Sequence, residues 1–175
     1  KDPEIAQDFL SPKLSHLDDP FAIKNMDLAV SRILQAREKR EKVLVVGDYD
    51  VDGITSTVMT NQALESLDLV VKTVIPKRLS EGYGLTEEVL DRGLTNGSFG
   101  LVIALDCGTN SVREAHWLRD KGIDLIVVDH HQLKAEILPD AILINPHLQQ
   151  EQGEAWRNLC TAGLCFKLIH ALFKK

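Results

Sequence analysis

The stretch VLVVGDYDVDGITST (residues 43–57) joins four apolar residues to three aspartates spaced at every second position. The run VLVV is short, apolar and rich in β-branched residues, which is typical of a strand buried inside a parallel sheet. Asp48, Asp50 and Asp52 follow it, and carboxylates this close repel one another. The stretch therefore predicts a buried strand whose end carries either a cation site or an aspartate-rich turn.

Strand-like and helix-like segments alternate along the rest of the chain. The apolar runs are residues 43–46, 69–75, 101–105 and 123–128, with a shorter fifth at 141–144. Helix-like stretches lie at residues 24–40, 54–67, 86–96, 110–121 and 158–173, and a polar loop is expected at 148–158. This order predicts an α/β fold: a parallel sheet of about five strands with helices on both faces.

The composition is that of an ordinary globular domain. Hydrophobic residues make up 44% of the 175-residue chain, and the net charge of -6 argues against a basic nucleic-acid-binding arm. The sequence has three cysteines without a CxxC pair, no apolar run of membrane-spanning length and no signal peptide. These features predict a cytoplasmic protein that does not contact a membrane. Residues 1–24 hold three prolines and predict an irregular leader ahead of one domain, residues 25–175.

Polar residues gather where the predicted strands end. Asp106 follows the run LVIAL, and Asp129, His130 and His131 follow IDLIVV. The carboxyl ends of parallel strands share one edge of the sheet, where ligands bind. We therefore expect these side chains to lie beside the three aspartates of the opening stretch.

Three interpretations of DYDVDG compete. A calcium-binding loop would need a glutamate where Met59 stands and a helix on both sides, so we reject it. In a haloacid-dehalogenase-like phosphatase Asp50 would attack phosphorus and Asp52 would act as acid and base, but the DHH tripeptide would have no role. In a two-metal centre Asp50 and Asp52, on the same side of an extended stretch, would each reach one Mn²⁺ or Mg²⁺ ion, and Asp106 would bridge the two. A DG turn and a helix cap at DHH are the structural alternatives.

The motifs together resemble the DHH phosphoesterase superfamily, and more closely the RecJ single-strand-specific exonucleases. The resemblance rests on the following stretches: GDYDVDGITST, PKRLSEGYGLTEEVL, ALDCGTN, VVDHHQ, INPH and LCTAGLCFKLIHAL. It implies a DHH-type, Rossmann-like catalytic subdomain that binds two ions, Mn²⁺ or Mg²⁺. It further implies that Asp50 and Asp106 hold one ion and that Asp52, Asp106 and His130 hold the other.

The resemblance also implies catalytic and substrate-binding roles. His131 would lie near the scissile phosphate, either supporting the metal ligands or acting as a proton donor, and Asp129 and Asp48 would orient the ligands and histidines. Arg78 would contact phosphate or DNA, with a surface arginine as the structural alternative. Tyr83 would stack on a base, between two glycines that serve tight turns.

The implied activity is 5′ to 3′ hydrolysis of single-stranded DNA in DNA repair and recombination. The alternatives are a DHH phosphodiesterase acting on short oligonucleotides or cyclic dinucleotides, and a non-catalytic scaffold that kept the fold. Val46 occupies a position where some family members have a histidine. The chain ends at Lys175, ahead of the place of the family's fourth metal-binding motif and second domain, so we expect a piece of a longer protein that is weakly active or inactive alone.

Overall fold

The computed structural model describes residues 3–134, 138–148 and 155–175. Within them a parallel five-stranded sheet has the order β2-β1-β3-β4-β5. Its strands are β1 (Lys42–Val46), β2 (Val70–Val74), β3 (Phe99–Leu105), β4 (Asp124–Val128) and β5 (Ile142–Ile144). The five predicted runs are therefore the five strands, and the predicted parallel α/β sheet is confirmed.

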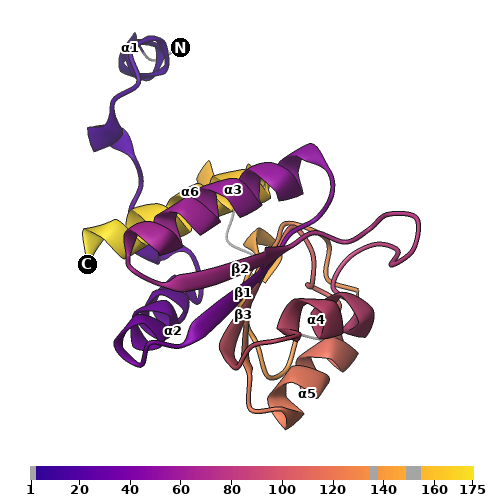
Figure 1. The fold of residues 1–175 in the computed structure, drawn as a ribbon. Helices are drawn as coiled ribbons and strands as arrows, with labels where there is room; N and C mark the ends of the chain where they lie inside the picture. The colour runs from indigo at the N-terminus through magenta and orange to yellow at the C-terminus, as the bar shows by residue number, and fades with distance from the viewer. Residues whose placement is uncertain (1–2, 135–137, 149–154) are drawn as a thin grey trace.

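Helices cover both faces of this sheet, as predicted (Figure 1). One face carries α2 (Met26–Glu38), α3 (Val51–Ser66) and α6 (Thr161–Lys174). The other carries α4 (Glu87–Leu94) and α5 (Val112–Asp120). The site described below lies where these layers meet at the carboxyl edge of the sheet.

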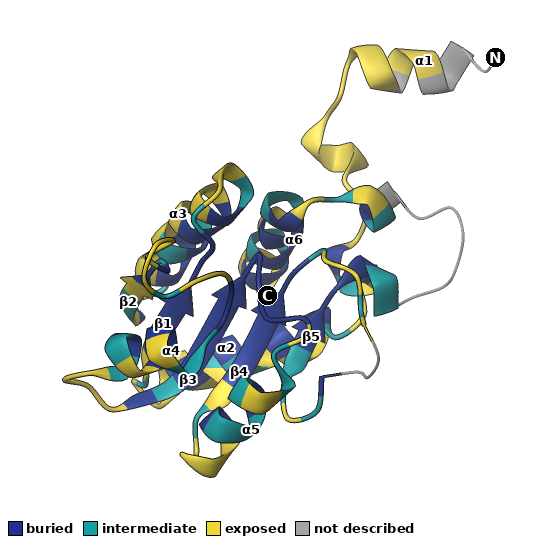
Figure 2. Ribbon diagram, turned by 90° about the vertical axis from the view of Figure 1, so that its right-hand side faces the viewer, coloured by how far each residue is buried: buried dark blue, intermediate teal, exposed yellow. Residues whose placement is uncertain are grey.

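The central strands are buried on both faces because their residues alternate between the two helical layers (Figure 2). In β3, Leu101, Ile103 and Leu105 pack against the α2, α3 and α6 layer. Val102 and Ala104 pack against the α4 and α5 layer. Each fully buried aliphatic side chain contributes roughly 1.5–3 kcal/mol, so the apolar runs that predict the strands also hold the layers together.

The strand order creates the position of the site. From β1 the chain passes to β2 on one side of β1, and then to β3, β4 and β5 on the other. Ligands bind at such a switch point, beyond the carboxyl ends of the two strands that flank it. Those strands are β1 and β3, which lead into Asp48 and Asp106. The aspartate-rich ends predicted from the sequence thus flank the crevice of the fold.

The strand register aligns the polar residues at this edge. Leu105 of β3 pairs with Val128 of β4, and Val128 pairs with Ile144 of β5. Asp106, Asp129 and Asn145 come one residue later on their strands. The ladder continues through them, since the Asp106 N–H donates to the Val128 carbonyl (3.0 Å) and the Asp129 N–H to that of Ile144 (3.1 Å). Three polar side chains therefore leave the sheet in one row.

The prediction of an irregular leader was wrong in part. A helix, α1 (Pro3–Leu10), and two 3₁₀ turns, Leu14–His16 and Pro20–Ala22, form within residues 3–22. Proline is favoured in the first turn of a helix, so Pro3 begins α1 rather than preventing it. Figures 1 and 2 show α1 apart from the domain, and Phe9 is exposed.

Two predicted helix boundaries move in the structure. The helix expected from residue 54 begins at Val51, because Asp50 caps it. The helix expected from residue 158 begins at Thr161, and a 3₁₀ turn, Ala155–Asn158, precedes it. Residues 149–154 of the predicted loop lie outside the described residues. Among the helices that are described, none has the length and apolarity needed to cross a membrane.

Candidate metal centre

Asp48 lies directly beneath the first turn of α3. It is buried, and its Oδ1 accepts a hydrogen bond from the Tyr49 N–H (2.8 Å). Gly53 packs on its backbone so closely that a Cβ at residue 53 would lie 2.7 Å from the Asp48 N, Cα and Cβ atoms. The glycine of DYDVDG is therefore a contact between α3 and the end of β1, not the turn that a DG pair usually marks.

Asp50 and Asp52 belong to the start of α3. Asp50 is the exposed N-cap residue, and its Oδ1 accepts from the Gly53 N–H at 2.9 Å. Asp52 is half-buried in the first helical turn. The prediction that both lie in one extended stretch was wrong, because the helix begins between them. Asp50 and Asp52 consequently face different neighbours.

Asp106 is the acid at the centre of the site. It turns the chain after β3 with φ of 62° and is 1% exposed. Its burial, together with the nearby charges of Asp52, Asp50 and Asp129, raises the pKa of the Asp106 carboxyl to about 6, although a hydrogen bond from the Thr161 hydroxyl (2.8 Å) opposes the rise. A carboxylate crowded in this way is stabilised by a cation.

Two groups of candidate metal ligands share Asp106. In one, Asp48, Asp50 and Asp106 offer ligand atoms within 4.8 Å of one another; in the other, Asp106, His130 and His131 do so. Carboxylate oxygens with imidazole nitrogens suit a divalent ion such as Mn²⁺ or Mg²⁺. Most of the predicted residues thus converge. Asp48 and His131, which were expected only to support the site, are themselves members of these groups.

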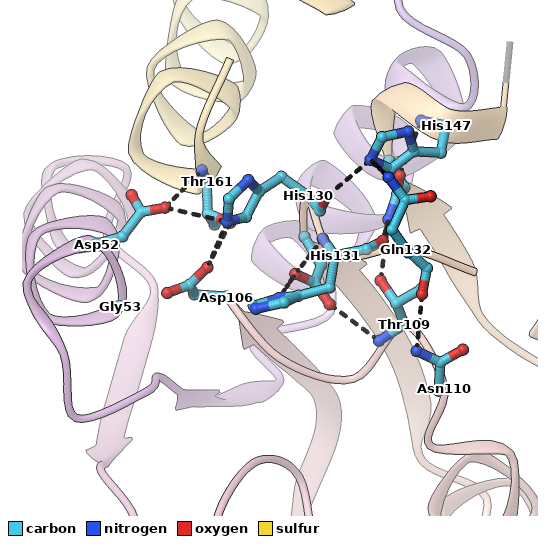
Figure 3. Close-up of polar contacts among 12 residues, drawn as sticks. Asp52, Gly53, Asp106, Thr109, Asn110, His130, His131, Gln132, His147 and Thr161 are labelled. Carbon is cyan, nitrogen blue, oxygen red and sulfur yellow. Dashed lines mark hydrogen bonds and ion pairs between the residues drawn. The ribbon is translucent and has the colours of Figure 1, made fainter. Parts of the chain in front are cut away.

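Asp52, on α3, reaches the centre at the side that faces α6. His130 Nε2 lies 3.7 Å from Asp52 Oδ2 and 3.6 Å from Asp106 Oδ1 (Figure 3). These distances are long for hydrogen bonds. They suit two ligands of one ion, since atoms about 2.1 Å from a common ion lie roughly 3–4 Å apart. His130 therefore lies between Asp52 and Asp106, whereas neither of the two groups above includes Asp52.

His131 forms a chain of polar contacts with Asp129 and Tyr83. Its Nδ1 lies 2.7 Å from Asp129 Oδ1, and its Nε2 lies 3.1 Å from the Tyr83 hydroxyl. Burial lowers the pKa of His131, but the hydrogen bond and charge of Asp129 outweigh burial and raise it overall. Burial would raise the pKa of Asp129, yet hydrogen bonds from Thr109 and His131 bring it below its usual value. Asp129 is thus an ionised partner that orients and charges the imidazole of His131.

A buried amide fixes the backbone that carries the two histidines. Asn145 Nδ2 donates to the His131 carbonyl (2.9 Å) and to Thr109 Oγ1 (3.0 Å). His147 Nε2 lies 3.0 Å from the His130 carbonyl oxygen. The resemblance includes INPH but implies no role for Asn145 and His147. The signal in the sequence is Asn145 directly after an apolar run, as at the other strand ends.

Arg78 and Tyr83 lie on the exposed segment between β2 and α4. The guanidinium carbon of Arg78 is 5.2 Å from the centroid of the Tyr49 ring, and the Tyr49 and Tyr83 rings meet edge-on at 6.1 Å. Arg92 holds this segment by two hydrogen bonds to Glu81 (2.6 and 2.7 Å) and one to the Ile75 carbonyl (2.9 Å). Both predicted substrate-binding residues are therefore brought to the same side as the acids.

A cavity of about 450 Å³ opens beside His131. Its walls include Tyr83, Cys107, Asn110 and Asp129. A larger cavity of about 530 Å³, lined by Arg32 and Arg119 among others, lies at the opposite edge of the sheet and includes none of the acids named above. Of these two cavities, the one beside His131 is lined by residues of the site, Asp129 and His131.

Residues 42–175 match the family described as "DHH family, N-terminal domain". The chain belongs to the DHH family. The match begins at β1 and extends to the end of α6, so it includes all the acids and histidines of the site. The haloacid-dehalogenase-like alternative is therefore not supported, and the DHH tripeptide has its place at the end of β4.

Relatives and solved structures agree with this membership. The chain is 39% identical over 169 residues to the single-stranded-DNA-specific exonuclease RecJ of Bacillus subtilis (strain 168), covering 97% of this chain and 21% of that protein. A crystal structure of exonuclease RecJ bound to manganese is 31% identical, with a TM-score of 0.78, over 87% of this chain and 38% of that one. The chain thus spans about a fifth of the length of the Bacillus relative.

The solved RecJ structures contain the ions that the sequence predicted. Beside the manganese-bound structure, RecJ from Thermus thermophilus in complex with Mg²⁺ shares this fold with a TM-score of 0.60 and 24% identity, over 96% of this chain and 19% of that one. The acidic residues described above are able to bind such a metal. The geometry therefore agrees with the predicted divalent-metal site, and the solved RecJ structure that is 31% identical holds manganese.

Gly53→Ala tests the contact between α3 and Asp48. We expect the substitution to lower the free energy of unfolding by about 1–3 kcal/mol, because the new methyl group overlaps backbone atoms that have little room to move. Denaturant unfolding followed by circular dichroism measures the change. Thr55→Ala, at an exposed position of α3, is the control and should change stability by less than about 0.5 kcal/mol. Equal stability of both variants would contradict the close contact.

Glu81→Gln tests the attachment of the segment that carries Arg78 and Tyr83. Hydrogen bonds from Arg92 and from the Lys77 N–H lower the pKa of Glu81 to about 2. A depressed carboxyl pKa stabilises the fold above the unfolded-state pKa of about 4.3 and loses that effect as pH falls towards 2. Wild type should therefore melt above Glu81→Gln at neutral pH, and the gap should close between about pH 5 and pH 2. A gap independent of pH, or an equal gap for the exposed Glu88→Gln control, would contradict this.

Proposed function

We propose that the chain is the metal-binding domain of a 5′ to 3′ exonuclease that hydrolyses phosphodiester bonds of single-stranded DNA with two divalent ions, in DNA repair and recombination in the cytoplasm. The observation that carries the proposal is that Asp106 belongs to both groups of candidate ligands at the switch point of the sheet. The RecJ relatives, named as single-stranded-DNA-specific exonucleases, support the substrate.

The two ions would be held on either side of Asp106. We assign Asp50 and Asp106 to one ion, with Asp48 beside them, and Asp52, Asp106 and His130 to the other. When bound, the pair supplies positive charge that stabilises the phosphate oxygens during displacement and lowers the pKa of the attacking water. A shared carboxylate keeps the two binding positions close enough to act on one phosphate.

His131 would donate the proton that the leaving oxygen needs. Asp129 holds its Nδ1, which leaves Nε2 as the nitrogen that faces Tyr83 and the cavity. The raised pKa of His131 favours the protonated ring, the form that acts as a general acid. Asp129 would thus orient His131 and stabilise its charge, as predicted from the resemblance.

Arg78 and Tyr83 would bind the DNA strand. Their exposed side chains and that of Tyr49 form a cationic and aromatic surface beside the acids. Single strands are bound without sequence preference by contacts to phosphate and by stacking of bases on aromatic rings. This surface would guide the phosphodiester of a strand end to the ions, whereas the net charge of -6 gives little attraction elsewhere.

A second function within the same family remains as the alternative: cleavage of short oligonucleotides or cyclic dinucleotides. The experiment that separates them compares the full-length protein on 5′-labelled single-stranded DNA and on dinucleotides, with Mn²⁺ titrated into both assays. We expect Mn²⁺-dependent loss of 5′ nucleotides from the longer strand. Preference for dinucleotides would overturn the proposed substrate. Absence of any metal-dependent cleavage would favour a scaffold without catalysis.

Asp106→Ala should abolish cleavage by the full-length protein, because both ion positions lose a ligand. The measurement is the initial rate on single-stranded DNA at saturating Mn²⁺. Asp91→Ala, an exposed acid on α4, is the matched control and should keep the wild-type rate. Activity of Asp106→Ala within about tenfold of wild type, a barrier difference of roughly 1.4 kcal/mol, would contradict the shared role.

A further inference from the structure

The first turn of α6 donates three hydrogen bonds into the acidic centre. Figure 3 shows Thr161 beside Asp52 and Asp106. The N–H groups of Thr161 and Ala162 donate to Asp52 Oδ2 (2.9 Å) and Oδ1 (2.8 Å). The Thr161 hydroxyl donates to Asp106 Oδ1 (2.8 Å). Cys160 occupies the N-cap position of α6 but makes no side-chain cap hydrogen bond. The carboxylate of Asp52, far away in sequence, supplies the missing cap.

The hydroxyl of Thr161 acts on one particular oxygen of Asp106. Asp106 Oδ1 is also the oxygen that lies 3.6 Å from His130 Nε2. Thr161 and Asp106 are both almost fully buried, so water has little access to replace this bond. A buried hydrogen bond to a charged acceptor is strong and directional. It therefore fixes the direction of Oδ1 relative to the imidazole of His130.

We propose that Thr161 is a positioning residue of the metal centre: its hydroxyl holds Asp106 Oδ1 towards His130 and so prepares the ion position formed with Asp52. This rests on the proposed two-metal function. The partners that hydrogen-bond to metal ligands typically change metal affinity about 10–100-fold when they are removed. Thr161 thereby links the start of α6 to both α3, through Asp52, and β3, through Asp106.

The capping of α6 is separable from this role. Both capping N–H groups belong to the backbone, whereas only the hydroxyl reaches Asp106. Thr161→Val replaces the hydroxyl with a methyl group of similar size and leaves both N–H donors in place. Thr161→Ser keeps the hydroxyl and removes the methyl group. A role in helix capping or packing alone would not distinguish these two variants by their metal binding.

The test is a titration of the full-length protein with Mn²⁺, in which free Mn²⁺ is measured by electron paramagnetic resonance. We expect Thr161→Val to weaken the binding of one ion by about tenfold or more, and Thr161→Ser to stay within about threefold of wild type. His130→Ala should weaken the same ion, and the double variant Thr161→Val/His130→Ala should show no further loss of comparable size, since residues that share one site are not additive. Thr161→Ala, also without the hydroxyl, should repeat the result for Thr161→Val.

The outcomes separate this role from the proposed function. Wild-type binding of two ions and normal cleavage, with unchanged Mn²⁺ affinity in Thr161→Val and Thr161→Ala, would overturn the role of Thr161 alone. Equal losses in Thr161→Ser and Thr161→Val would also overturn it, because packing would then explain the effect. No binding of Mn²⁺ by the wild-type protein would overturn the metal centre and this inference together.

Discussion

Mutual repulsion among carboxylates at one edge of a parallel sheet is the constraint on which this structure depends. Asp48, Asp106 and Asp129 are each about 1% exposed, so water cannot offset their charges. Hydrogen-bond donors of the protein instead point at these carboxylates. Asp48 accepts from the Tyr49 N–H, Asp129 from Thr109 and His131, and Asp106 from the Thr161 hydroxyl. These donors do not fully offset the burial of Asp106 and the nearby acids, which raise its pKa, and a divalent ion would supply the positive charge that this carboxylate lacks.

Much of this arrangement can be predicted from one sequence pattern, an apolar run followed by polar residues. Apolar β-branched runs predict the strands, parallel strands end at one edge, and the residues after each run therefore meet. The sequence therefore predicts that Asp48, Asp106, Asp129 and the two histidines lie together. Strand order is not needed for this prediction, because every strand of a parallel sheet contributes its carboxyl end to the same edge.

The parts that the sequence did not predict are those that long-range contacts decide. The switch point between β1 and β3 depends on strand order, which the apolar runs do not encode. The turn of Asp52 towards α6 depends on packing between residues 109 positions apart, so a local period of two gave the wrong orientation. Thr161 does not stand out in the sequence because a threonine near the start of a helix is an ordinary helix-capping residue. The helix α1 was not predicted because three prolines within residues 1–24 indicated irregular structure, although proline is favoured in the first turn of a helix.

The central claim is that one buried carboxylate is shared by two ions. The most direct measurement is a crystal structure of the full-length protein grown with Mn²⁺, with the ions located by their anomalous scattering. We predict two peaks about 3.5–4 Å apart, each bonded to Asp106, one with Asp50 and the other with Asp52 and His130. A single peak, or two peaks of which only one touches Asp106, would contradict the account.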